Sequence, residues 1–75
     1  MSCPNEFKQR IGENIATIRE RKGWGRYELS HRSGIKYETL SAIENGRTNA
    51  TAGSLCGIAN ALGVKVDQLL GEQGE

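Results

Sequence analysis

Four positions of one short segment carry an unusual mixture of side chains. In the segment HRSGIKYETLSAIENGR, residues 31–47, they offer a phenol, a carboxylate, a hydroxyl and a methyl group: Tyr37, Glu38, Ser41 and Ala42. A plain solvated helix face carries mostly charged and polar side chains. This set instead presents hydrogen-bonding and apolar atoms together, which suits contact with a partner surface.

Catalytic and metal-binding chemistry has little support in the sequence. The single histidine, His31, is expected at the surface, and the two cysteines, Cys3 and Cys56, lie far apart and outside any CxxC motif. No glycine-rich phosphate loop follows a strand, and no paired carboxylates stand out. We therefore expect no enzyme activity, metal, cofactor or small-molecule ligand. Cys56 is expected to be a small buried residue, and Cys3 is a candidate for an intermolecular disulfide.

The length of 75 residues predicts one small domain, whose core is marginal at 36% hydrophobic residues. The net charge of +1 indicates no particular partner. Its distribution is uneven, because residues 19–47 hold seven Lys or Arg against four Glu, whereas residues 48–75 hold one Lys against three acidic residues. No apolar run approaches the roughly 20 residues of a membrane span, and no signal peptide opens the chain, so we expect a cytoplasmic protein without membrane contact.

The apolar spacing predicts an all-α domain of five short helices over residues 6–71, between a lead of residues 1–5 and a frayed tail of residues 72–75. The first helix ends at Gly23, and Trp24 is expected in the core or at its edge. One face of this helix is apolar at spacings of four, four and three: Phe7, Ile11, Ile15 and Ile18.

Two shorter helices are expected next, over residues 26–33 and 37–45. Gly34 between them marks a turn, because glycine adopts the left-handed conformation without strain. Ile35, directly after this turn, is expected to be buried in the core. The apolar residues of the two helices that we expect to face inward are Leu29, Leu40 and Ile43.

The fourth helix is expected to run to Leu62, with Thr51 as its N-cap and Gly63 as its C-cap. Gly53 and Gly57 inside it either allow close packing or simply weaken the helix, at about 1 kcal/mol each relative to Ala. The sequence does not distinguish these alternatives. A short fifth helix is expected over VKVDQLL, residues 64–70.

The second and third helices join through the sequence SGI. Ser30 is small enough to let the two helices cross closely, and Gly34, four residues later, allows the bend. This arrangement is a helix-turn-helix, whose second helix enters the major groove of DNA. The mixed residues of the third helix are therefore candidates to contact base edges.

Each of the four candidates has a chemistry suited to base recognition. Glu38 can accept a hydrogen bond from cytosine N4, although DNA phosphates repel it. Tyr37 can contact a thymine methyl or donate to a phosphate, and Ala42 offers a methyl for apolar contact. Ser41 can bond to several bases and is weakly specific.

Other roles stay open for some of these residues. Tyr37 can instead shield the start of its helix from solvent. Glu38 can instead interact favourably with the positive end of the helix dipole, or pair with Arg19 or Lys22. Glu44 is expected to stabilise the fold through a salt bridge with Arg19.

Two longer runs resemble a known family. KGWGRYELSHRSGIKYETLSAIENGRTN, followed by LCGIANALGVKVDQLLG, is similar to the Cro and lambda-repressor-like helix-turn-helix family, often called the XRE family. The resemblance covers residues 7–71 and is most specific in SGIKYETLSAIENGR and ALGVKVDQLLG. It implies a compact five-helix domain that binds double-stranded DNA and regulates transcription.

The resemblance also implies roles for single residues. It implies base reading by the four candidates above and contacts to DNA phosphates by four further residues: Arg26, Lys36, Asn45 and Arg47. Thr39 is expected to pack within the fold or to contact a phosphate rather than to read a base. Three positions depart from the residues common in the family. Arg26 stands where a glutamine is usual, Lys36 where Ser or Thr is usual, and Ala50 where a proline is frequent.

One recognition helix covers few base pairs, so specificity usually requires two helices, one turn apart on a pseudo-palindromic operator. The family commonly dimerises through its last helix. The resemblance therefore implies a homodimer interface of four apolar residues: Val64, Val66, Leu69 and Leu70. The alternative is that these residues only close the monomer core.

These inferences predict a homodimeric, sequence-specific transcriptional regulator of the phage repressor or restriction–modification controller type. RNA polymerase is a further candidate partner. The alternative is the antitoxin of a toxin–antitoxin pair, which would bind a toxin protein as well as its own operator.

Overall fold

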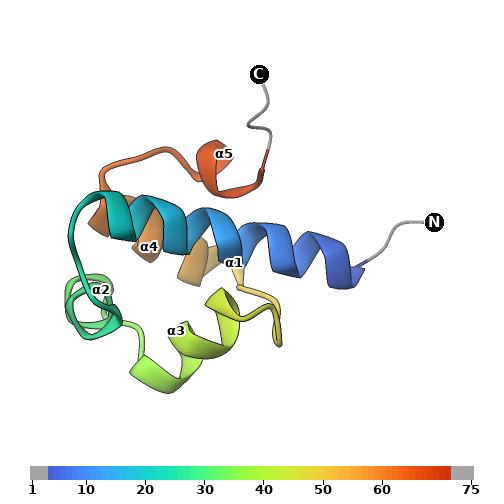
Figure 1. Cartoon of the computed structure of the whole chain (residues 1–75), viewed down its shortest axis with the longest axis horizontal. Helices are drawn as coiled ribbons and strands as arrows, with labels where there is room; N and C mark the ends of the chain where they lie inside the picture. Colours follow the sequence, from blue (N-terminus) through green and yellow to red (C-terminus); the bar gives the residue numbers. More distant parts are fainter. Residues whose placement is uncertain (1–3, 72–75) are drawn as a thin grey trace.

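The computed structural model describes residues 4–71 and shows five α-helices and no strand among them (Figure 1). The helices are α1 (Pro4–Arg21), α2 (Arg26–Ser33), α3 (Tyr37–Glu44), α4 (Ala52–Leu62) and α5 (Val66–Leu69). The predicted all-α fold is therefore confirmed. The predictions for residues 1–3, Cys3 included, and for the tail of residues 72–75 lie outside the described residues.

The long helix α1 forms the centre of the arrangement. It packs against α3, α4 and α5, while α2 packs against α3 and α4. Figure 1 shows α2 and α3 on one side of α1 and α5 on the other. The helix pair that carries the candidate DNA contacts therefore lies away from the chain's last helix.

Three helix ends differ from the prediction. Helix α5 begins at Val66, because the Val64 amide donates to the Ala59 carbonyl at 3.0 Å and thereby closes α4. Lys65 between them is extended, with φ −85° and ψ 151°. Helix α1 begins at Pro4, within the predicted lead, and α3 ends one residue earlier than predicted. The Thr51 N-cap is confirmed, since its side chain accepts a hydrogen bond from the Ser54 amide.

Apolar side chains from all five helices form one core. Fully burying a side chain of this size contributes roughly 1.5–3 kcal/mol. Trp24 is half-buried and packs against the core, as predicted. Ile35 also packs against the core but is half-buried rather than buried. The core residues, each at most 5% exposed, are Ile11, Ile15, Leu29, Leu40, Ile43, Ile58, Ala59, Leu62 and Leu69.

Two further predictions of burial are wrong. Phe7 is 48% exposed, because the first turns of α1 extend past the helices that cover the rest of it (Figure 1). Cys56 is exposed on α4. Successive residues of a helix point about 100° apart, and the buried face of α4 is set by Ile58, Ala59 and Leu62, so Cys56 lies off that face.

Two glycines mark close approaches between helices. A Cβ on Gly12 of α1 would lie 2.4 Å from the Ile43 carbonyl oxygen of α3, and a Cβ on Gly57 would lie 3.2 Å from the Ser33 carbonyl oxygen. Gly53, in contrast, has no heavy atom within 4 Å of the position of a Cβ. Gly57 is thus a packing position, whereas Gly53 only weakens α4. The close approach at Gly12 was not predicted from the sequence.

We expect Gly12→Ala and Gly53→Ala to change stability in opposite directions. The added methyl group at Gly12 would overlap the α3 backbone, so the free energy of unfolding should fall by about 2 kcal/mol or more. At Gly53 it meets open space and reduces the entropy of the unfolded chain, so stability should rise by about 0.5 kcal/mol. Urea unfolding followed by circular dichroism measures both. Equal effects of the two variants would contradict the close approach of α1 and α3.

Candidate nucleic-acid interface

The turn between α2 and α3 is closed by short-range hydrogen bonds. Gly34 has a φ of 77°, as predicted for the left-handed conformation, and its amide donates to the Ser30 carbonyl at 3.0 Å. The Ser30 hydroxyl donates to the Ile35 carbonyl, and the Ile35 amide donates to the Ser33 hydroxyl at 3.3 Å. Ser30 is therefore more than a small residue, since it holds the first residue after the bend. The two helices form the predicted helix-turn-helix.

Helix α3 turns one face to the core and the opposite face to solvent. Leu40 and Ile43 are 0% and 1% exposed. Of the predicted base-reading residues, Glu38 is exposed, and Tyr37, Ser41 and Ala42 are half-buried. All four therefore retain surface that a partner can contact. Of the predicted phosphate-contacting residues, Arg26 is half-buried, and the exposed ones are Lys36, Thr39, Asn45 and Arg47.

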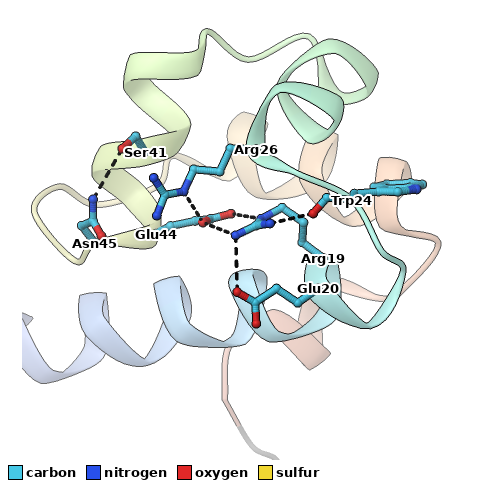
Figure 2. A network of polar contacts seen from close by, with 7 residues as sticks. All are labelled: Arg19, Glu20, Trp24, Arg26, Ser41, Glu44 and Asn45. Carbon is cyan, nitrogen blue, oxygen red and sulfur yellow. Dashed lines mark hydrogen bonds and ion pairs between the residues drawn. The ribbon is translucent and has the colours of Figure 1, made fainter.

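A buried carboxylate joins the three helices of this region. Glu44 of α3, whose side chain is 1% exposed, accepts two hydrogen bonds from Arg19 of α1, from Nε at 2.8 Å and from Nη2 at 3.1 Å (Figure 2). Arg26 of α2 donates its Nε to the same carboxylate at 2.9 Å. Arg19 also donates its Nη1 to the Trp24 carbonyl at 2.7 Å. The predicted pairing of Glu44 with Arg19 is confirmed, and Arg26 is an additional partner.

The Arg26 guanidinium is held against α3 by its hydrogen bond to Glu44. Its pKa is raised above the ordinary value, chiefly by its hydrogen bond to Glu44 and secondarily by the Tyr37 hydroxyl. The side chain is still 35% exposed, and a guanidinium has five N–H donors, of which Nε is used on Glu44. Arg26 can therefore brace α3 and reach a DNA phosphate at the same time.

A second polar contact links two predicted DNA-contacting residues. The Asn45 side-chain amide donates to the Ser41 hydroxyl at 3.4 Å (Figure 2). The alternative pairing of Glu38 with Arg19 is not formed, because the guanidinium of Arg19 is held by Glu44, with the Glu20 carboxylate at 3.8 Å. The alternative partner Lys22 instead lies over the Trp24 ring, with its Nζ 5.3 Å from the ring centroid. Glu38 therefore presents its carboxylate to solvent.

One residue of this face was missed by sequence reasoning. The ring of Tyr27 on α2 stacks on that of Tyr37 on α3, with centroids 4.3 Å apart and planes inclined by 23°. The two residues are ten positions apart and meet only because α2 and α3 cross. The available signal was a large aromatic residue in a short helix for which the sequence offers Leu29 as the main inward-facing residue. The structure leaves Tyr27 75% exposed.

The four residues predicted for a dimer interface differ in how much surface they leave exposed. Leu69 is 0% exposed, because α5 packs this side chain between α1 and α4, so Leu69 has no surface for a partner. Its assignment to the interface is corrected. Val64, Val66 and Leu70 are half-buried and pack against the core. His31 is exposed, as predicted.

The residues that the structure describes offer neither a membrane-spanning helix nor a metal-binding group. Within them, no helix is long and apolar enough to cross a membrane. The same residues hold no group of three or more His, Cys, Asp or Glu that could bind a metal ion.

Comparison with known proteins identifies the class. A family model described as helix-turn-helix matches residues 15–69. The chain belongs to the helix-turn-helix family of transcriptional regulators, of the Cro and lambda-repressor-like or XRE type. Members of this class are DNA-binding regulators and not enzymes, and their ligand is double-stranded DNA.

Individual relatives agree with this class. An uncharacterised HTH-type transcriptional regulator, y4dJ of Sinorhizobium fredii, is 37% identical over 65 residues, which cover 87% of this chain and 84% of the relative. The immunity repressor of Bacillus phage phi105 is 29% identical over 63 residues, which cover 84% of this chain. The chain spans only 44% of that repressor's length.

Solved structures show the same fold. The hypothetical transcription factor NHTF from Neisseria is 30% identical with a TM-score of 0.82, and the match covers 93% of this chain and 80% of that one. The restriction–modification controller protein C.AhdI from Aeromonas hydrophila has a TM-score of 0.80 at 22% identity, over 83% of this chain and 94% of that one. At that identity the likeness to the controller shows the fold alone.

We expect Glu44→Gln to destabilise the protein by about 3 kcal/mol. The substitution leaves two guanidinium groups close together without their shared negative charge, and removing one partner of a buried ion pair leaves an uncompensated charge. Denaturant unfolding at neutral pH measures the loss. The matched control is Glu20→Gln, whose carboxylate is 70% exposed and 3.8 Å from Arg19, and which should cost less than about 0.5 kcal/mol. If the two losses are alike, the carboxylate of Glu44 does not join the helices.

Proposed function

We propose that the protein is a sequence-specific transcriptional regulator that binds a pseudo-palindromic operator as a homodimer, with α3 in the major groove. The observation that supports this most is the outward face of α3, where Glu38 is exposed beside half-buried Tyr37, Ser41 and Ala42. Such a face can distinguish bases by hydrogen bonds and methyl contacts.

Cationic and amide side chains surround this face. Lys36 precedes α3, Arg47 follows it, Asn45 is its C-cap, and Arg26 lies beside it on α2. Thr39 adds an exposed hydroxyl. We propose that these five residues contact DNA phosphates and fix the position of α3, while the four residues of the recognition face read the bases.

The dimer follows from the size of α3. Its eight residues reach only a few base pairs, so a regulator gains specificity by placing two copies one helical turn apart. The surface that we propose for the partner copy is made of Val64, Val66 and Leu70, which are apolar and only half-buried. Val66 is the first residue of α5, Leu70 is its C-cap, and Val64 follows the C-cap of α4. Figure 1 shows α5 on the opposite side of α1 from α2 and α3, so a partner bound at α5 would leave the proposed DNA face open.

Among regulators of this class, we propose the phage repressor or restriction–modification controller type. The named relatives include a phage immunity repressor, and a controller protein shares the fold. The position of the operator decides the direction of regulation, since a protein bound over a promoter blocks RNA polymerase and one bound upstream can recruit it.

In vitro selection of random duplex DNA at roughly physiological salt tests this function. We expect enrichment of an inverted repeat whose half-sites are about 10 base pairs apart, because a symmetric dimer binds two half-sites one turn apart. Enrichment of a single short site without symmetry would contradict the dimer. Binding without any enrichment, abolished as salt rises, would contradict sequence-specific regulation altogether.

The Glu38→Ala variant tests base reading by α3. We expect weaker discrimination at one base pair of each half-site, by about 1–3 kcal/mol, together with equal or higher affinity for unrelated DNA, because a charge that phosphates repel is removed. Fluorescence anisotropy with single-base operator variants measures both. Glu20→Ala removes the same charge from α1 and should leave the discrimination unchanged. Unchanged discrimination in Glu38→Ala, with a lower melting temperature, would show that Glu38 serves only the fold.

A further inference from the structure

Tyr27 is the most exposed large apolar side chain among the described residues, at 75%. It nevertheless lies in one defined contact, a stack on Tyr37 with ring centroids 4.3 Å apart. The near-parallel planes, inclined by 23°, place one face of Tyr27 against Tyr37 and leave the other face to solvent. The stack therefore orders Tyr37 without burying Tyr27.

The backbone under Tyr27 is well held. Two residues further along α2, Leu29 is fully buried in the core, and Ser30 closes the turn through its hydroxyl. On the other side of Tyr27, Arg26 is held by Glu44. Tyr27 thus stands on a fixed helix and can act as a support for a neighbouring ring.

The first turn of α3, unlike the backbone near Tyr27, is not held by side-chain hydrogen bonds within its own helix. Tyr37 is its first residue, and the N-cap Lys36 makes no side-chain capping hydrogen bond. The Tyr37 ring is contacted by the Tyr27 ring, and its hydroxyl lies close enough to Arg26 to affect that guanidinium. The observed contact on this first side chain of the recognition face therefore comes from α2.

We propose that Tyr27 is a positioning residue for base recognition, which holds the ring of Tyr37 in the orientation that contacts the operator. This inference rests on the proposed function of α3. Tyr27 acts through Tyr37 and does not itself read a base. An aromatic stack of this kind contributes enough to change the population of a side-chain orientation by about two- to tenfold.

The stack has a spectroscopic signature in the free protein. The chain contains two tyrosines, so selective labelling of tyrosine rings gives one set of signals for each. We expect ring-current shifts of the Tyr37 signals to disappear in Tyr27→Ala and to persist in Tyr27→Phe. Tyr37 signals that do not move in Tyr27→Ala would overturn the stack and the proposal.

DNA binding tests the functional part with the wild-type operator recovered by selection. Tyr27→Ala should lose about two- to tenfold of its discrimination at the same base pair that Tyr37→Ala affects, and Tyr27→Phe should retain it. In the Tyr37→Ala background, Tyr27→Ala should cause no further loss of discrimination. A further loss there, or binding that Tyr27→Ala weakens equally for all sequences, would show direct DNA contact and overturn the positioning role.

The two proposals fail in different ways. If the wild-type protein selects no operator, the proposed function fails before Tyr27 is tested. If it selects an operator and Tyr27→Ala discriminates as well as the wild type, the positioning role fails and the proposed function stands.

Discussion

The arrangement of the first three helices depends on one buried carboxylate. Glu44 receives both a two-point contact from Arg19 on α1 and a third hydrogen bond from Arg26 on α2. A buried charge of this kind is very costly unless all its partners are in place, so the position of one helix is tied to that of the other two. The geometry of the face that we propose for DNA binding therefore depends on a charge network among α1, α2 and α3 (Figure 2).

Close packing between α1 and α3 fixes the position of α3, as the ion pairs of Glu44 do. The backbone of α3 comes so close to Gly12 that any side chain there would overlap it, and this contact lies at the same end of α3 as Glu44. An isolated helix of eight residues is too short to be stable in water. Helix α3 therefore owes its orientation to α1 and α2. The outward side chains of α3, which we propose to contact DNA, are therefore not needed to orient the helix.

Much of the fold follows from local rules that are visible in the sequence. The apolar spacing located the five helices, Gly34 and Thr51 marked a turn and a helix start, and the family resemblance pointed to the recognition face. The pairing of Arg19 with Glu44 was also foreseen. These features depend on the periodicity of one helix, on the conformational freedom of one residue, or on a charge pair, and a single sequence contains that information.

The tertiary structure decided which of these features face one another. The exposure of Phe7 and the complete burial of Leu69 depend on where neighbouring helices end, and the periodicity of a helix carries no record of its neighbours. The different surroundings of Gly12 and Gly53 depend on how closely two backbones approach. Other contacts, such as the Tyr27 ring on Tyr37 and the Arg26 guanidinium on Glu44, form only at the crossing of α2 with α3. The sequence by itself thus determined the elements and the class, whereas the crossing of the helices decided which side chains support the recognition face, because such contacts join residues far apart in the chain.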